Sequence, residues 1–234
     1  MLENGTAKMV TTDGHRLAYI EREAGVPGDQ TMDALIPKKA LTELTKISRG
    51  AEGEVSFGED TNHIYFEVDG RLLITRKLSG SFPNYEMVIP KDNDKTVEFD
   101  LEEMKRTVAR VALMADERTR SVRMTIKDGE IEVEAESSEE GEAKERVAAD
   151  YSGEAVQIGF NSQYLQEFLN NVSAGETAEV ETEQETDGEK VKVKESAGSP
   201  RIKFEFKDSN AQTLMTIAGN SDYEYKYIVM PLRI

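Results

Sequence analysis

The feature that most constrains the fold is a repeat: helical and strand-like segments follow one another in the same order three times along the chain. In residues 33–68 a segment with helical apolar spacing is followed by two alternating segments. In residues 96–136 a strand, a helix and a hairpin follow one another, and a strand and a helix begin again at Val156. A period of 3.6 indicates a helix and a period of two a strand. The repeat predicts an α+β protein built of β-α-β half-domain units with antiparallel strands.

Local signals set the element boundaries in the second copy. Asp100 is a good helix N-cap and is followed by Glu103 at the third helical position. The helix predicted over 101–115 carries one apolar stripe, and Asp128-Gly129 predicts a two-residue hairpin turn between the next strands. The apolar stripes of the three helices are Leu41, Leu44 and Ile47; Leu101, Met104, Val108 and Val111; and Leu165, Phe168, Leu169 and Val172.

The segment before the first copy, residues 7–23, resembles only the strand tail of a fourth unit. Four half-units make two domains, which we place at 1–94 and 95–234, the first truncated at its N-terminal side. Residues 173–200 are charged, with Gly and Ser at both ends, and predict a long solvent-facing hairpin inserted in the second domain. Residues 223–230 are then the last strand, which Pro231 ends.

The charge is strongly acidic overall, with 46 Asp and Glu against 29 Lys and Arg and a net charge of −17. This excludes a protein that binds nucleic acid over its whole surface, but not one with a localised basic face. Arg106 and Arg110 lie opposite the apolar stripe of their helix, and Lys38 and Lys39 lie away from that of theirs. The alternative is that these are ordinary solvated helix faces.

Catalysis finds little support in the sequence. His15 and His63 are the only histidines, the residue type most often used for acid–base chemistry near neutral pH. There is no nucleophile elbow, phosphate-binding loop, dinucleotide-binding loop or metal-binding His pair. We therefore expect no enzyme activity, no cofactor and no metal. The absence of cysteine, of a signal peptide and of a membrane-spanning apolar stretch favours a reducing, cytoplasmic setting.

Four motifs, in this order, resemble the bacterial DNA polymerase III β subunit, the sliding clamp family: VTTDGHRLAYI, GSFPNYEMVIPKDNDK, IGFNSQYL and YIVMPLRI. The resemblance covers essentially the whole chain and implies the family's middle domain, without its start, and its C-terminal domain. It implies a DNA-clamp fold with antiparallel sheets outside and helices on the pore face. A processivity factor of this kind encircles double-stranded DNA without sequence specificity, and Lys38, Lys39, Arg106 and Arg110 become the implied DNA contacts.

The family also implies a pocket that takes short peptides from partner proteins. Those partners are the DNA polymerase III α subunit, the clamp loader, repair polymerases and other proteins with a clamp-binding motif. Met87 and Thr119 depart from residues found in some members and put the peptide preference in doubt. The implied pocket residues are Thr12, Gly14, His15, Arg16, Leu17, Pro83, Val88, Asn161, Tyr164, Ile228, Val229, Met230, Pro231, Leu232 and Arg233.

Leu113 and Met114 match a position that packs across the family's homodimeric ring interface. The partner surface belongs to an N-terminal domain that this chain lacks, so we do not expect the chain alone to close a ring. Two alternatives stay open. One is an acidic α+β protein-interaction module that binds clamp partners without encircling DNA. The other is a carboxylate-dependent hydrolase, for which no spacing of acidic residues singles out a pair.

Overall fold

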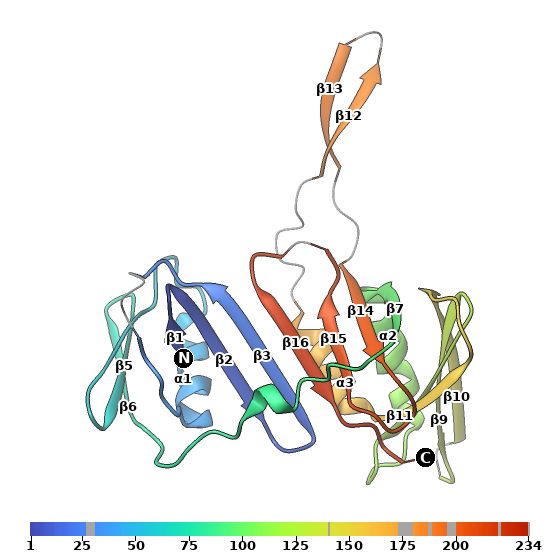
Figure 1. Ribbon diagram of the computed structural model, residues 1–234, viewed down its shortest axis with the longest axis horizontal. Coiled ribbons are helices and arrows are strands. Elements are labelled where there is room, and N and C mark those ends of the chain that lie inside the picture. The colour runs from blue at the N-terminus through green and yellow to red at the C-terminus, as the bar shows by residue number, and fades with distance from the viewer. Residues whose placement is uncertain are drawn as a thin grey trace. The chain divides into compact units, whose positions relative to one another are not determined.

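The computed structural model describes residues 1–26, 31–139, 141–172, 180–186, 189–195, 200–219 and 221–233. The chain folds into two compact units (Figure 1). Unit 1 comprises Met1–Ala7 and Ala24–Tyr85, and unit 2 comprises Lys8–Glu23 and Glu86–Ile234. Strand β2 (Thr6–Thr12) passes from one unit to the other, and the 3-10 turn η1 (Tyr85–Met87) lies at the second crossing.

In its described residues, unit 1 combines the helix α1 with a small sheet. β1 pairs antiparallel with the beginning of β2, and β4, β5 and β6 form a three-stranded sheet against which α1 packs. Alternate residues of β5, Ile64, Phe66 and Val68, are buried, as a strand with one covered face requires. The elements are β1 (Leu2–Glu3), α1 (Lys38–Ser48), β4 (Ser56–Glu59), β5 (His63–Val68) and β6 (Arg71–Arg76).

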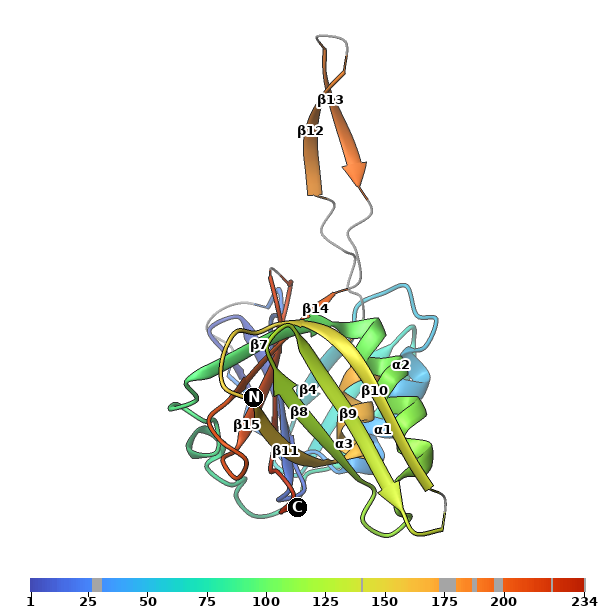
Figure 2. The same ribbon diagram turned by 90° about the vertical axis from the view of Figure 1, so that its right-hand side faces the viewer.

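In its described residues, unit 2 combines most strands of the larger sheet with the helices α2 and α3. From β3 onward the strand order is β3-β16-β15-β14-β7-β10-β9-β8-β11. Figure 2 looks onto β8, β9 and β10, with α2 beside them. The elements are β3 (Arg16–Glu23), β7 (Lys95–Asp100), α2 (Leu101–Val111), η2 (Ala112–Met114), β8 (Ser121–Lys127), β9 (Glu130–Ser137), β10 (Gly141–Asp150), β11 (Val156–Asn161), α3 (Ser162–Asn171), β14 (Arg201–Phe206), β15 (Thr213–Ile217) and β16 (Glu224–Val229).

The local signals of the second copy are confirmed. The carboxylate of Asp100 accepts a hydrogen bond from the Glu103 backbone N–H at 2.8 Å, which caps α2. The β8–β9 hairpin turns at Asp128-Gly129, where Gly129 has a φ of 74° that favours glycine. The helix predicted to reach residue 115 ends at Val111 and tightens into the turn η2.

The core of unit 2 contains several buried aromatic side chains among its aliphatic ones. α2 packs against α3, and the α3 side chain of Phe168 lies 5.1 Å from the ring of Tyr227 on β16. Phe204 and Phe206 stack at 5.3 Å on β14. Each such aromatic pair adds about 0.5–1.5 kcal/mol beyond the free energy of burial. Tyr225, Tyr227 and Val229 belong to this core, which therefore holds β16 in place.

Part of the predicted insertion at 173–200 is described. β12 (Val180–Thr186) and β13 (Glu189–Glu195) pair antiparallel in a sheet of their own. Residues 173–179, 187–188 and 196–199 lie outside the described residues. None of the helices in the described ranges is long and apolar enough to cross a membrane.

Candidate functional site

The turn between β2 and β3 is held by its own side chains. The Asp13 carboxylate accepts hydrogen bonds from the backbone N–H groups of His15, at 3.0 Å, and Arg16, at 3.1 Å. The Thr12 hydroxyl donates to the Arg16 carbonyl at 2.7 Å, and Gly14 takes a φ of 87°. Asp beside Gly suits such a turn because Asp bonds its own backbone and Gly tolerates positive φ. The motif TDGHR therefore presents His15 and Arg16 from a fixed backbone.

Arg16 ties three elements of unit 2 together. Its guanidinium pairs with Glu167 on α3 at 2.7 Å and with Asp13 at 3.1 Å. It also donates to the Tyr227 hydroxyl at 3.1 Å and lies 4.2 Å from the centroid of the Tyr164 ring. A planar guanidinium suits both bonding and stacking on an aromatic face.

The contacts of this cluster favour a cationic Arg16, an anionic Asp13 and a neutral Tyr227. Burial alone lowers the pKa of Arg16, but its bonds to Tyr227, Glu167 and Asp13 raise that pKa well above the ordinary value. Burial raises the pKa of Tyr227, so its hydroxyl stays protonated and donates to the Tyr164 carbonyl at 3.0 Å. The pKa of Asp13 is lowered, because hydrogen bonds from His15 and Arg16 outweigh the opposing effect of burial.

The C-terminal residues lie along this cluster. β16 pairs antiparallel with β3, with Val229 opposite Arg16. The Met230 N–H then donates to the His15 carbonyl at 3.0 Å, and the Leu232 N–H to the Gly159 carbonyl at 2.8 Å. The prediction of a terminal strand is confirmed, and Ile234 lies outside the described residues. The end of the described chain is thus bonded both to the TDGHR turn and to β11.

The structure brings together some of the predicted pocket residues at the surface. Thr12, Gly14, His15 and Arg16 lie in one turn, and the Arg16 guanidinium lies over the Tyr164 ring. Met230, which is 40% exposed, bonds the His15 carbonyl of that turn through its backbone N–H. Pro231 and Leu232 are partly exposed and Arg233 is exposed.

Other predicted residues lie beneath that surface or elsewhere. Leu17 is only 2% exposed, and Ile228 and Val229 are equally buried, so they support the site from the core. Asn161 caps α3, its side-chain oxygen accepting from the Gln163 N–H at 2.9 Å. Val88 is half-buried in unit 2, whereas Pro83 is exposed in unit 1.

Sequence reasoning missed three residues of the cluster, Asp13, Glu167 and Tyr227. Asp13 stands before Gly14, a pair that by itself indicates only a turn. Glu167 lies three residues after Tyr164, on the same side of a helix, which is a usable signal once Tyr164 is suspected. Tyr227 looks like an ordinary strand residue, and only the pairing of β16 with β3 gives it a role.

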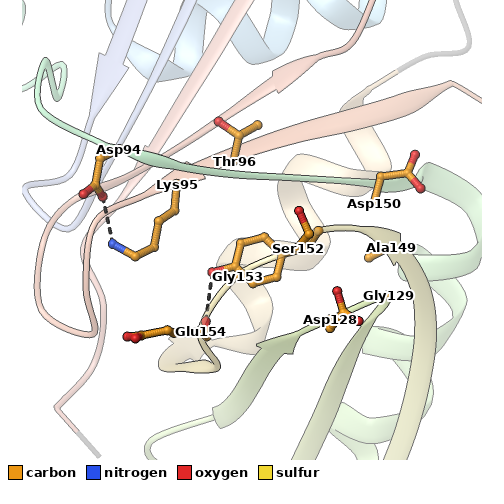
Figure 3. A pocket seen from close by; sticks show the side chains of 11 residues that line it. Asp94, Lys95, Thr96, Asp128, Gly129, Ala149, Asp150, Ser152, Gly153 and Glu154 are labelled. Atoms are coloured by element: carbon orange, nitrogen blue, oxygen red, sulfur yellow. Dashed lines mark hydrogen bonds and ion pairs between the residues drawn. The ribbon is translucent and has the colours of Figure 1, made fainter.

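The described surface of unit 2 has hollows near the end of the chain and near β7. One, of about 680 Å³, includes the last described residues among its lining: Ala155, Val156, Gln157, Lys207, Asp208, Ser209, Asn210, Leu232 and Arg233. The other, of about 760 Å³, is lined by several carboxylates, among them Asp94, Asp128 and Asp150 (Figure 3). It contains no predicted site residue, so we do not include it in the candidate site.

The four basic residues predicted to contact DNA differ in whether their side chains are already engaged in other bonds. Lys38 and Lys39 on α1 are exposed, and among the described residues neither forms an ion pair. Arg106 is exposed and bonds the Glu102 carbonyl at 3.1 Å. Arg110 is exposed but already pairs with Glu145 on β10, at 2.7 Å from its Nε. Next to α2, Leu113 is 72% exposed and Met114 is partly buried. Within the described ranges, no three His, Asp or Glu side chains gather as metal ligands would.

Comparison with known proteins shows that the sequence of this chain matches one protein family. Residues 1–84 match the family model of the DNA polymerase III beta subunit central domain, and residues 86–197 match that of its C-terminal domain. The β sliding clamp of Pseudomonas aeruginosa is 30% identical over 234 residues, and that of Caulobacter vibrioides is 30% identical over 239 residues. These matches cover 100% and 99% of this chain but only 56% of either relative. The chain therefore spans about half the length of the curated relatives it matches.

Solved structures show the same likeness. A sliding clamp from Pseudomonas aeruginosa bound to griselimycin superposes with a TM-score of 0.81 at 28% identity, over 100% of this chain and 56% of that one. A clamp from Caulobacter crescentus gives a TM-score of 0.78 at 28% identity, over 98% of this chain and 54% of that one. The predicted α+β clamp fold is confirmed, and it defines a protein of the DNA-clamp class. The chain belongs to the DNA polymerase III β subunit family, the β sliding clamps.

Proposed function

We propose that this chain acts as part of a sliding-clamp processivity factor that tethers replication and repair proteins to duplex DNA. The observation that carries the proposal is the surface formed by the TDGHR turn, Tyr164 and Met230 in a chain of the β sliding clamp family. The proposal assigns the chain a binding role without catalysis, in the cytoplasm. It treats the chain as the family's middle and C-terminal domains, at 1–94 and 95–234.

The site would hold a short peptide from a partner protein. The exposed side chain of Met230 and the partly exposed side chains of Leu232 and Val88 offer apolar contact, with His15 and Arg233 as polar neighbours. Binding sites commonly combine apolar walls with a few polar groups that fix orientation. A flexible methionine adapts to more than one partner sequence. We propose as partners the DNA polymerase III α subunit, the clamp loader, repair polymerases and other proteins with a clamp-binding motif.

The DNA contacts would come from exposed basic residues on the helices. Lys38 and Lys39 are the strongest candidates because neither is engaged in an ion pair among the described residues. Arg106 is also exposed. Arg110 must leave Glu145 before it can reach a phosphate, so we expect its contribution to be smaller. Phosphate contacts of this kind carry no sequence specificity and weaken as salt rises.

The proposed clamp function includes assembly into a ring around DNA, and the alternative function described below does not. Leu113 and Met114 are proposed as a subunit interface, because Leu113 leaves a large apolar side chain in solvent. The alternative function is a protein-interaction module that binds clamp partners but does not encircle DNA. Retention on circular DNA, with release when the DNA is cut, distinguishes the first function from the second.

Peptide titration tests the proposed site. A fluorescent peptide with glutamine followed by hydrophobic residues should bind, and deletion of residues 230–234 should abolish binding. Met230→Ala should weaken binding about tenfold, a loss of about 1.4 kcal/mol. Met9→Ala is the matched control, because Met9 is also an exposed methionine of unit 2 and should have no effect.

Griselimycin provides a second probe, since a Pseudomonas aeruginosa clamp has been solved with it bound. It should compete with the peptide for this chain. Affinity unchanged by both Met230→Ala and the deletion would show that the site lies elsewhere.

A further inference from the structure

Methionine is the residue type through which this chain can react reversibly with oxidants. The sequence has nine methionines and no cysteine. A methionine thioether takes up one oxygen atom to become a sulfoxide, which turns a flexible apolar side chain into a polar one, and reductases reverse the change. Because the sulfur must meet the oxidant, exposed methionines should react before buried ones.

The methionines of unit 2 differ strongly in exposure. Met87 is 81% exposed, Met9 is 48% exposed and Met230 is 40% exposed. The methionines of the core are at most 2% exposed: Met104, Met124 and Met215. Unit 2 therefore carries reachable methionines at its surface and protected ones in its core, and Met230 is the reachable one at the end of β16, beside the TDGHR turn.

The backbone on both sides of Met230 is held in place. Its own N–H donates to the His15 carbonyl at 3.0 Å. The preceding residue, Val229, is buried in β16, and the Leu232 N–H donates to the Gly159 carbonyl at 2.8 Å. Since residue 230 is fixed between these contacts, a sulfoxide formed on it stays at the candidate site.

Partial exposure makes Met230 both reachable and important for binding. An oxidant can reach its exposed part, and a bound peptide that covers it would bury the sulfoxide oxygen. Burying a polar group without a hydrogen-bond partner costs free energy, so oxidation should weaken binding. Met87 is more exposed and should react sooner.

We propose that Met230 is a reversible oxidation site and that its sulfoxide weakens the binding of partner peptides. The oxidant is a peroxide. The thioether sulfur attacks one peroxide oxygen, the O–O bond breaks, and the second oxygen leaves as water, so that sulfur is oxidised while hydrogen peroxide is reduced. A reductase supplied with a dithiol reverses the step, since the sulfoxide oxygen leaves as water and the dithiol becomes a disulfide. The inference rests on the proposed function, because it concerns the same peptide site.

Peptide mapping tests the reactivity of Met230, because trypsin separates the exposed methionines of unit 2. Cleavage after Lys and Arg leaves each in a fragment without a second methionine: Met9 in 9–16, Met87 in 78–91 and Met230 in 227–233. The folded chain is treated with increasing hydrogen peroxide and digested. We expect one added oxygen on Met230 well before any on Met104 of the core. Equal rates of oxidation at these two residues would overturn the proposal.

Peptide titration before and after peroxide treatment tests the consequence for binding. The peptide carries glutamine followed by leucine and phenylalanine, without methionine, and catalase removes the peroxide before the measurement. The oxidised chain should bind about tenfold more weakly than the untreated chain. Methionine sulfoxide reductase with a dithiol should restore the affinity. Met230→Leu, which cannot form a sulfoxide, should have the same affinity before and after treatment, whereas Met87→Leu and Met9→Leu should lose affinity as the unmodified chain does.

The outcomes separate this inference from the proposed function. Unchanged affinity in a chain whose Met230 is oxidised by mass would overturn the inference and would not affect the peptide site. An equal loss in the Met230→Leu chain would assign the effect to another residue and would also overturn it. A circular dichroism spectrum that changes together with the affinity would assign the loss to unfolding and contradict it as well. A peptide that fails to bind even the untreated chain would refute the proposed function, and this inference with it.

Discussion

The two units bury their helices to very different degrees. α2 of unit 2 buries Leu101, Met104, Thr107, Val108 and Val111, whereas α1 of unit 1 buries only Ala40. Both helices are amphipathic in sequence. Unit 2 encloses a run of aromatic side chains, while the small sheet of unit 1 leaves Leu72 and Ile74 exposed. The difference teaches that an apolar stripe predicts a helix but not how completely the helix will be covered.

The two units should therefore differ in how much each contributes to the stability of the fold. Unit 2 holds a closed core and every contact of the Arg16 cluster, so its fold and its candidate site depend on the same residues. Unit 1 has a thin core and an open strand edge. We therefore expect unit 2 to dominate the free energy of unfolding and unit 1 to gain most from an added partner.

The largest expected effect is the loss of a core aromatic in unit 2. Phe204→Ala removes a fully buried ring that stacks on Phe206 and should lower the free energy of unfolding by about 3–5 kcal/mol. Leu72→Ala, at an exposed position of unit 1, should change it by less than about 0.5 kcal/mol. Urea titration followed by circular dichroism measures both. Similar losses for the two variants would remove the contrast between the units.

A smaller effect is expected at the cluster that joins β3, α3 and β16. Arg16→Ala removes the ion pair with Glu167 and the hydrogen bond to the Tyr227 hydroxyl, and should lower the free energy of unfolding by about 1.5–3 kcal/mol. The control is Arg22→Ala, which breaks an exposed pair with Asp222 and should cost less than about 1 kcal/mol. If the two variants unfold at the same urea concentration, Arg16 does not join the elements as described.

The cap of α2 should contribute less again. Asp100→Ala removes the side-chain acceptor for the Glu103 N–H and should lower the free energy of unfolding by about 1 kcal/mol. Asp100→Asn keeps an acceptor and should retain most of that stability. Thermal unfolding of the two variants checks this, and an equal drop for both would assign the loss to charge rather than capping.

The smallest expected effect is a pH dependence of the free energy of unfolding, which arises from Glu132 and Glu134 on β9. Hydrogen bonds from Lys144 lower the pKa of Glu132, and those from Arg123 and Lys144 lower the pKa of Glu134 against the effect of burial. A carboxyl whose pKa is lowered on folding stabilises the fold above its unfolded pKa, and that stability is lost as the pH falls below about 4.5. Lys144→Met should therefore lose less stability between pH 7 and pH 3 than the unmodified chain. A steeper loss in the variant would reverse the sign of this account.

Sequence alone predicts the elements whose signals are local. The cap at Asp100, the turn at Asp128-Gly129 and the terminal strand each depend on neighbouring residues, and all three are confirmed. The family and its clamp fold are also predicted, because the TDGHR and VMPLRI motifs are distinctive.

What the sequence does not predict depends on contacts between distant segments. β6 reads RLLITR, in which apolar and polar residues do not alternate, because apolar Leu72 and Ile74 occupy its more exposed face. In β10, charged residues stand at both more and less exposed positions, so its sequence does not show the apolar–polar alternation of a strand. Arg16 meets Glu167 and Tyr227 across 151 and 211 positions, so no local pattern reveals the cluster.

Hydrogen exchange with and without the clamp-binding peptide tests the central claim most directly, because it reports on both units at once. We predict added protection in the Thr12–Leu17 turn, around Tyr164 and along residues 228–233, with no change in β4, β5 and β6. Protection confined to β4–β6, with the turn and the C-terminal residues unchanged, would contradict the account.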